Sequence, residues 1–113
     1  MNNNFEKITL LIKNKKLSEA INCLNNLSDE EKKEPNFGFL LGISYLFLGD
    51  FNQAIDNFNS AIKANNNNSS FYYYRGYTFS KLCKFDKTEE DYLKAISLKP
   101  KSAELYNLSL IHI

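Results

Sequence analysis

One spacing recurs along this chain, because residues of the same kind stand 34 positions apart. The pairs that show it are Phe51 and Phe85, Gly42 and Gly76, Ala61 and Ala95, and Phe58 and Tyr92. A fixed period of this length indicates a stack of similar units that bury their apolar faces against one another. The 113 residues therefore predict a single domain. Its repeats are expected over 1–34, 35–68 and 69–102, with a partial repeat over 103–113.

Within each repeat, apolar residues recur at three- and four-residue steps, which predicts two amphipathic helices and an all-α fold. In the second repeat, Leu41 and Tyr45 belong to one such stripe, and Gly42 lies where another helix axis would come closest. Gly49 and Asp50 separate the two helices, since glycine can end a helix and aspartate can cap the next one. We expect helices over 4–14, 17–28, 36–48, 51–64, 70–82, 85–98 and 103–113.

The residues in these stripes resemble the tetratricopeptide repeat. The resemblance rests on Leu41, Gly42, Tyr45, Gly49, Phe51, Ala54, Phe58 and Ala61, and on Tyr72, Gly76, Phe79, Phe85, Tyr92, Ala95 and Pro100. It covers essentially the whole chain, although the first repeat is degenerate. The departures are Gly38, Cys83, Thr88 and Glu89. The resemblance implies a right-handed α-solenoid of antiparallel helix pairs whose concave groove holds peptide segments.

The first helix of each repeat is expected to line that groove with the side that points away from its own partner helix. The candidate peptide-binding residues are Phe39, Ile43, Phe47, Tyr73, Tyr77 and Lys81. An apolar, tyrosine-rich strip suits an extended or helical peptide with apolar anchors. The alternative is that these aromatic residues belong to the core, or are covered by further repeats or a partner subunit.

The resemblance also implies a test for one functional subclass. In tetratricopeptide co-chaperones, a clamp of lysine, asparagine and arginine residues grips the terminal carboxylates of heat-shock chaperones. The matching positions here are Phe5, Thr9, Leu40, Ser70 and Tyr74, and none supplies a cation or an amide. Arg75 is one residue out of register and is expected to point toward the packed face. The sequence therefore argues against binding of a chaperone carboxylate tail.

Composition excludes several other partners. Fourteen basic and thirteen acidic residues give a net charge of +1, which disfavours nucleic acid and anionic lipid. No apolar stretch approaches the roughly 20 residues that a membrane span requires, and the start lacks a secretory pattern, so a cytoplasmic protein is expected. No metal or cofactor is expected, because Cys23 and Cys83 are isolated thiols and Glu89, Glu90 and Asp91 read as a solvated face.

No nucleophile, base and orienting group converge at a recognisable spacing, and His112 is the single histidine. We therefore predict a non-enzymatic scaffold that binds a partner protein, with no catalytic site. The alternative is the recognition segment of a larger enzyme, of glycosyltransferase or phosphatase type, whose catalytic part lies outside this chain. The chain is expected to be a fragment. Residues 108–113 also match the translation of a transposon end sequence that is used in DNA library preparation.

Overall fold

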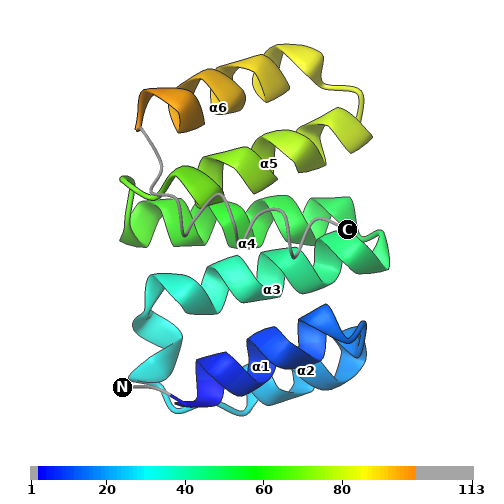
Figure 1. Ribbon diagram of the computed structural model, residues 1–113, viewed down its shortest axis with the longest axis vertical. Helices are drawn as coiled ribbons and strands as arrows, with labels where there is room; N and C mark the ends of the chain where they lie inside the picture. The colour runs from blue at the N-terminus through cyan, green and yellow to red at the C-terminus, as the bar shows by residue number, and fades with distance from the viewer. Residues whose placement is uncertain (1–2, 99–113) are drawn as a thin grey trace.

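The computed structural model describes residues 3–98, which form a stack of α-helices (Figure 1). The elements are α1 (Asn3–Lys13), α2 (Leu17–Asn25), a 3-10 helix η1 (Glu31–Lys33), α3 (Pro35–Leu48), α4 (Phe51–Ala64), α5 (Ser69–Lys81) and α6 (Phe85–Ser97). The all-α prediction is confirmed. The expected ends agree to within one residue except at the end of α2, and the helix expected over 103–113 lies outside the described residues.

The helices form antiparallel pairs, α1 with α2, α3 with α4 and α5 with α6, and the pairs are stacked in chain order (Figure 1). Each second helix also contacts the first helix of the following pair, as α4 does with α5. The first helices α1, α3 and α5 contact one another in sequence. This pattern makes a solenoid with the first helices on one side and the second helices on the other.

The turns inside the pairs follow the same 34-residue register. Lys15, Gly49 and Cys83 all adopt the left-handed conformation, with φ of 63°, 87° and 59°. In each turn the next backbone N–H donates to a carbonyl in the preceding helix at 2.9 Å, namely Lys16 to Leu11, Asp50 to Tyr45 and Lys84 to Phe79. The prediction that Gly49 ends a helix is confirmed. The other two turns reach this conformation without glycine, which is unfavourable for a residue with a Cβ.

Gly42 and Gly76 lie in the contact between the two helices of a pair. A Cβ at Gly42 would stand 2.5 Å from Cε1 of Phe58, and a Cβ at Gly76 would stand 2.9 Å from Cβ of Asp91. Both predicted close contacts are confirmed. Gly38 extends the same seam, since its Cβ would stand 2.8 Å from the backbone oxygen of Asn57. The bulky residue usual at this family position would therefore not fit between α3 and α4.

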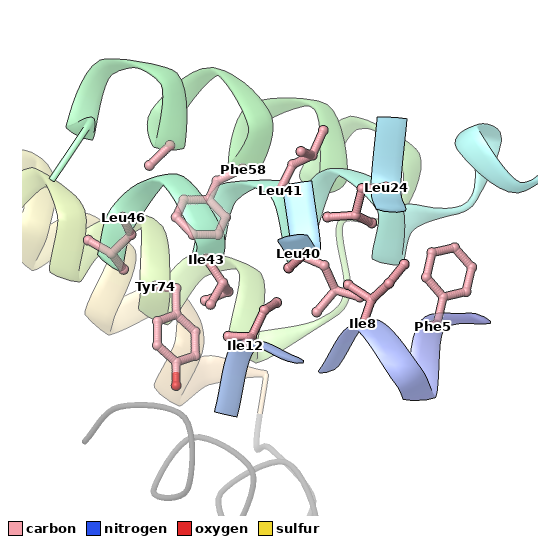
Figure 2. Close-up of a cluster of buried hydrophobic side chains, with 12 residues drawn as sticks. Phe5, Ile8, Ile12, Leu24, Leu40, Leu41, Ile43, Leu46, Phe58 and Tyr74 are labelled. Atoms are coloured by element: carbon pink, nitrogen blue, oxygen red, sulfur yellow. The ribbon is translucent and has the colours of Figure 1, made fainter. Parts of the chain in front are cut away.

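The core runs continuously from α1 to α5 because each apolar stripe meets the next (Figure 2). Ile12 from α1 and Tyr74 from α5 lie on either side of Ile43 from α3 (Figure 2). Phe58 of α4 is fully buried and closes the second pair. The cluster comprises Phe5, Ile8, Ile12, Ala20, Leu24, Leu40, Leu41, Ile43, Leu46, Ala54, Phe58 and Tyr74.

A short 3-10 helix that the sequence analysis did not anticipate separates the first two pairs. Ser28 and Glu31 cap it reciprocally: the Glu31 N–H donates to the Ser28 hydroxyl oxygen at 3.2 Å, and the Ser28 N–H donates to Oε1 of Glu31 at 3.1 Å. This is the pattern of a capping box, which begins a new helical turn. It explains why α2 ends at Asn25, three residues before the expected boundary.

Candidate functional site

The exposed part of the predicted strip lies on α5. Tyr73, Tyr77 and Lys81 follow one another at four-residue steps and therefore share one side of the helix. Tyr73 and Tyr77 are half-buried and Lys81 is exposed. The Lys81 Nζ lies 5.1 Å from the centroid of the Tyr77 ring, within the range of a cation–π contact. These residues form an aromatic surface with a positive charge at one end.

Tyr73 is held in place by two other rings. It stacks on Tyr92 of α6 with a centroid separation of 5.3 Å and an interplanar angle of 20°, and it meets Tyr74 edge-on at 5.3 Å. Burial raises the pKa of Tyr73, and the nearby Tyr77 raises it further. The ring is therefore neutral and fixed before any ligand arrives, so binding against it costs little side-chain entropy.

On α3, Phe39 and Phe47 are half-buried. The Phe39 ring lies 5.0 Å from Phe71, 5.7 Å from Tyr74 and 6.0 Å from Phe58. Phe39 thus joins the strip to the core and presents only part of its ring. Phe39 therefore belongs partly to the core, as the alternative interpretation of these aromatic residues expected.

Ile43 is fully buried, and the sequence prediction that it lines an open strip does not match its position. The reason is its place in the stack. Because α3 is the middle one of the three first helices, its inward side chain meets Ile12 from α1 and Tyr74 from α5 (Figure 2). Ile43 therefore supports the strip from the core in this conformation and is not a contact residue.

Asp91 has a role that the sequence analysis missed. It was expected on a solvated face, but only 4% of it is exposed. Arg75 of α5 donates from Nε and Nη2 to the two Asp91 oxygens at 2.9 and 2.7 Å, and from Nη1 to Oδ1 of Asn59 at 3.0 Å. The hydrogen bond to Asp91 raises the pKa of Arg75. A signal was present, because an arginine predicted to face the packed side needs an acidic partner.

The five positions that match the chaperone clamp are mostly buried in this chain. Phe5, Leu40, Ser70 and Tyr74 are between 0% and 8% exposed. The Thr9 hydroxyl is half-buried and donates to the Phe5 carbonyl at 2.8 Å. These side chains therefore build the helix contacts on the side where the clamp would lie.

The buried hydroxyls also serve the fold. Ser44 and Thr78 donate to the carbonyls four residues before them at 2.8 and 2.7 Å, and Thr88 donates to the Gly76 carbonyl at 3.0 Å. Thr88 thereby links α6 to α5 where the glycine brings the two helices together. These contacts account for the threonine where the family usually has alanine.

Cys23 and Cys83 are exposed free thiols. Among residues 3–98, no group of three or more histidine, cysteine, aspartate or glutamate side chains is placed to hold a metal ion. Within the same part of the chain, every helix is too short or too polar to cross a membrane.

The 34-residue period, the stacked antiparallel pairs and the glycines between paired helices define an α-solenoid repeat protein. The family profile described as tetratricopeptide repeat matches residues 39–68 and 69–102, which together make up more than half of the chain. The chain therefore belongs to the tetratricopeptide repeat family. Comparison with curated proteins found no match.

Solved structures share this fold. The first tetratricopeptide domain of Spaghetti (RPAP3), bound to the HSP90 peptide SRMEEVD, has 25% identity and a TM-score of 0.79, covering 96% of this chain and 85% of that one. The second such domain, bound to the same peptide, has 18% identity and a TM-score of 0.79, covering 86% and 90%. MamA MSR-1 C2 has 21% identity and a TM-score of 0.72, covering 83% and 56%.

These comparisons contradict one expectation from the sequence. The clamp positions argued against chaperone carboxylate tails as ligands, yet two similar domains were solved with an HSP90 peptide in place. The sequence argument rested on five side-chain positions alone, whereas the similarity to these peptide-bound domains extends over 86–96% of the chain.

Proposed function

We propose that this chain is a protein-interaction scaffold that binds an extended peptide segment of a partner against its first helices. The observation that carries the proposal is the half-exposed strip of Phe47, Tyr73 and Tyr77, with Lys81 at its end. Rigid aromatic rings offer large contact areas at low entropic cost, and the tyrosine hydroxyls can bond to a peptide backbone. The packed helices hold these rings in fixed positions on one side of the fold.

The strip favours a particular ligand chemistry. Apolar side chains of a peptide would lie against Tyr73 and Tyr77, and an acidic group would lie near the Lys81 ammonium. The peptide SRMEEVD, which the two similar Spaghetti domains hold, contains both kinds of group. It is therefore the first ligand to test on this chain.

We further propose that the described helices act by binding and not by catalysis. The buried polar side chains support this view, because Asp91, Thr88 and Thr78 are each committed to a contact that joins or shapes helices. A binding module of this kind changes its partner's location or availability and leaves its covalent structure unchanged.

The test is calorimetric titration of SRMEEVD into the unmodified chain and into the double variant Tyr73→Ala with Tyr77→Ala. We expect the double variant to weaken binding by about tenfold or more, which is the effect of losing hot-spot aromatic residues. Phe85→Ala is the matched control, since Phe85 is an exposed aromatic residue on α6 and should leave the affinity unchanged.

Two outcomes count against the proposal. If SRMEEVD binds equally well to the double tyrosine variant, the site lies elsewhere on the chain. If SRMEEVD does not bind, peptides selected from a displayed library replace it. The strip would be refuted as a peptide site if every selected peptide bound the double tyrosine variant as tightly as the unmodified chain. Circular dichroism of each variant checks that the helices are intact.

A further inference from the structure

Three residues form a row that crosses the first helices at one edge of the stack. Lys13, Phe47 and Lys81 stand 34 positions apart, in the last turns of α1, α3 and α5. Each lies two residues before the left-handed residue of its turn, so the three hold equivalent places in their helices. The first helices run in the same direction, which brings their C-terminal ends to one edge (Figure 1). We call these three residues the end row.

The two outer members of the end row are cations that the fold does not use in ion pairs. Lys13 and Lys81 are exposed, and Phe47 between them is half-buried. The ion pairs within residues 3–98 join other side chains, so neither lysine is held by a carboxylate there. The Lys81 Nζ lies 5.1 Å from the centroid of the Tyr77 ring, a contact that still allows the ammonium to donate to an oxygen. Carboxylates of a ligand could therefore pair with both lysines without breaking an ion pair of the fold.

The turns that follow the first helices have the same order of charge. Lys15 and Lys16 follow α1, and Lys84 follows α5. The turn after α3 instead carries Asp50, whose carboxylate accepts a hydrogen bond from the Gln53 N–H at 3.3 Å. This edge is therefore positive beside α1 and α5, but apolar and then negative beside α3. It attracts acidic groups at its two sides and disfavours one in its middle.

We propose that the end row selects an extended acidic peptide, which crosses the three first helices with one carboxylate at Lys13, one at Lys81, and apolar side chains against Phe47. The inference rests on the proposed function, because Phe47 and Lys81 belong to the same strip. Helices in contact lie about 8–10 Å apart, so the outer two first helices are about 16–20 Å apart. α3 contacts both of them.

This span fixes the spacing of the acidic residues. An extended peptide advances about 3.3 Å per residue and directs every second side chain to the same face. Two acidic residues six positions apart therefore reach the two lysines from one face of the peptide. Apolar residues two and four positions after the first acidic residue share that face and lie against Phe47.

Calorimetric titration of two peptides with the same composition tests the spacing. Both are acetylated and amidated, which removes their terminal charges. ESLSLSE has its glutamates six positions apart with two leucines between them, whereas LSESESL has its glutamates in the middle and its leucines at the ends. We expect ESLSLSE to bind the unmodified chain about fivefold more tightly or better, and to weaken as salt is added.

Charge reversal tests each lysine. Lys13→Glu and Lys81→Glu should each weaken binding of ESLSLSE by about fivefold or more, because an attraction becomes a repulsion. A peptide with a lysine at one end, KSLSLSE or ESLSLSK, should restore the affinity of each variant. Lys63→Glu is the matched control and should change nothing, since Lys63 is an exposed lysine in the last turn of α4, a second helix.

Either of two results overturns the inference. One is that ESLSLSE binds no more tightly than LSESESL, and the other is that reversal of either end-row lysine has no more effect than Lys63→Glu. If binding is lost in the double variant Tyr73→Ala with Tyr77→Ala but ignores both lysines, the end row is refuted and the proposed peptide strip still stands. Circular dichroism checks that each variant keeps its helices.

Discussion

Replacing Gly42 by alanine should destabilise the fold, although alanine is the better helix former. The new Cβ would stand 2.5 and 2.6 Å from Cε1 and Cδ1 of Phe58. Carbon atoms in contact normally lie about 3.5–4.0 Å apart, so the ring would have to move by about 1 Å. Phe58 is fully buried and its ring also packs on Phe39 at 6.0 Å, so that movement disturbs the core.

The net magnitude follows from two opposing effects. Alanine in place of glycine favours a helix by about 1 kcal/mol. Overpacking typically costs about 1–3 kcal/mol, and three ring atoms within 3.0 Å place Gly42 at the upper end, for a net loss of about 2 kcal/mol. At Gly76 the nearest atom is Cβ of the buried Asp91 at 2.9 Å, a looser contact than the one at Gly42, so Gly76→Ala should cost about 1 kcal/mol less than Gly42→Ala.

Urea unfolding followed by circular dichroism measures both variants, with an unchanged slope as the check that the fold is the same. In a chain that also carries Phe58→Leu, Gly42→Ala should cost at least about 1 kcal/mol less, because the ring it meets is gone. Equal losses for Gly42→Ala and Gly76→Ala would refute the reasoning. So would the absence of coupling between Gly42 and Phe58.

Three further predictions concern stability. Burial raises the pKa of Tyr74 and Tyr92, so their neutral forms favour the fold. The free energy of unfolding should therefore stay constant below about pH 10, the ordinary tyrosine pKa, and fall as the pH rises above it. Urea unfolding should show a less steep fall for Tyr74→Phe than for the unmodified chain. Cys83→Gly should raise stability by about 1 kcal/mol by removing a left-handed non-glycine residue; a lower unfolding midpoint would contradict this. Asp91→Ala should lower the free energy of unfolding by about 3 kcal/mol, because it leaves Arg75 without its buried partner. A loss of stability no larger than that of Glu90→Ala would show that the ion pair contributes little.

The sequence predicted the parts of this fold that depend on periodicity. The register placed Gly42 and Gly76 between paired helices, and both are there, because a Cβ at these positions would stand 2.5 Å from Phe58 or 2.9 Å from Asp91 of the partner helix. The turn at Gly49 was predictable for the same kind of reason, since a left-handed residue favours glycine. Each of these follows from one residue and its place in the repeat.

The candidate strip was harder to predict, because exposure depends on neighbours that lie far away in the sequence. Ile43 and Tyr77 have the same register position in α3 and α5, yet Ile43 is fully buried between α1 and α5 whereas Tyr77 is half-buried. Asp91 was missed because three consecutive acidic residues resemble a solvated face. Neighbouring residues on a helix diverge by about 100°, and one of the three turns toward Arg75.

The bonds of Arg75 have a consequence for how the array loses its structure. In a linear array, the free energy divides into a contribution from each repeat and one from each junction between neighbours. Arg75 belongs to both at once, because it holds α6 through Asp91 and α4 through Asn59. Detaching α6 would thus weaken the α4–α5 junction as well, so the second and third hairpins should open as one cooperative unit. Backbone amides of α4, α5 and α6 would then exchange hydrogen together.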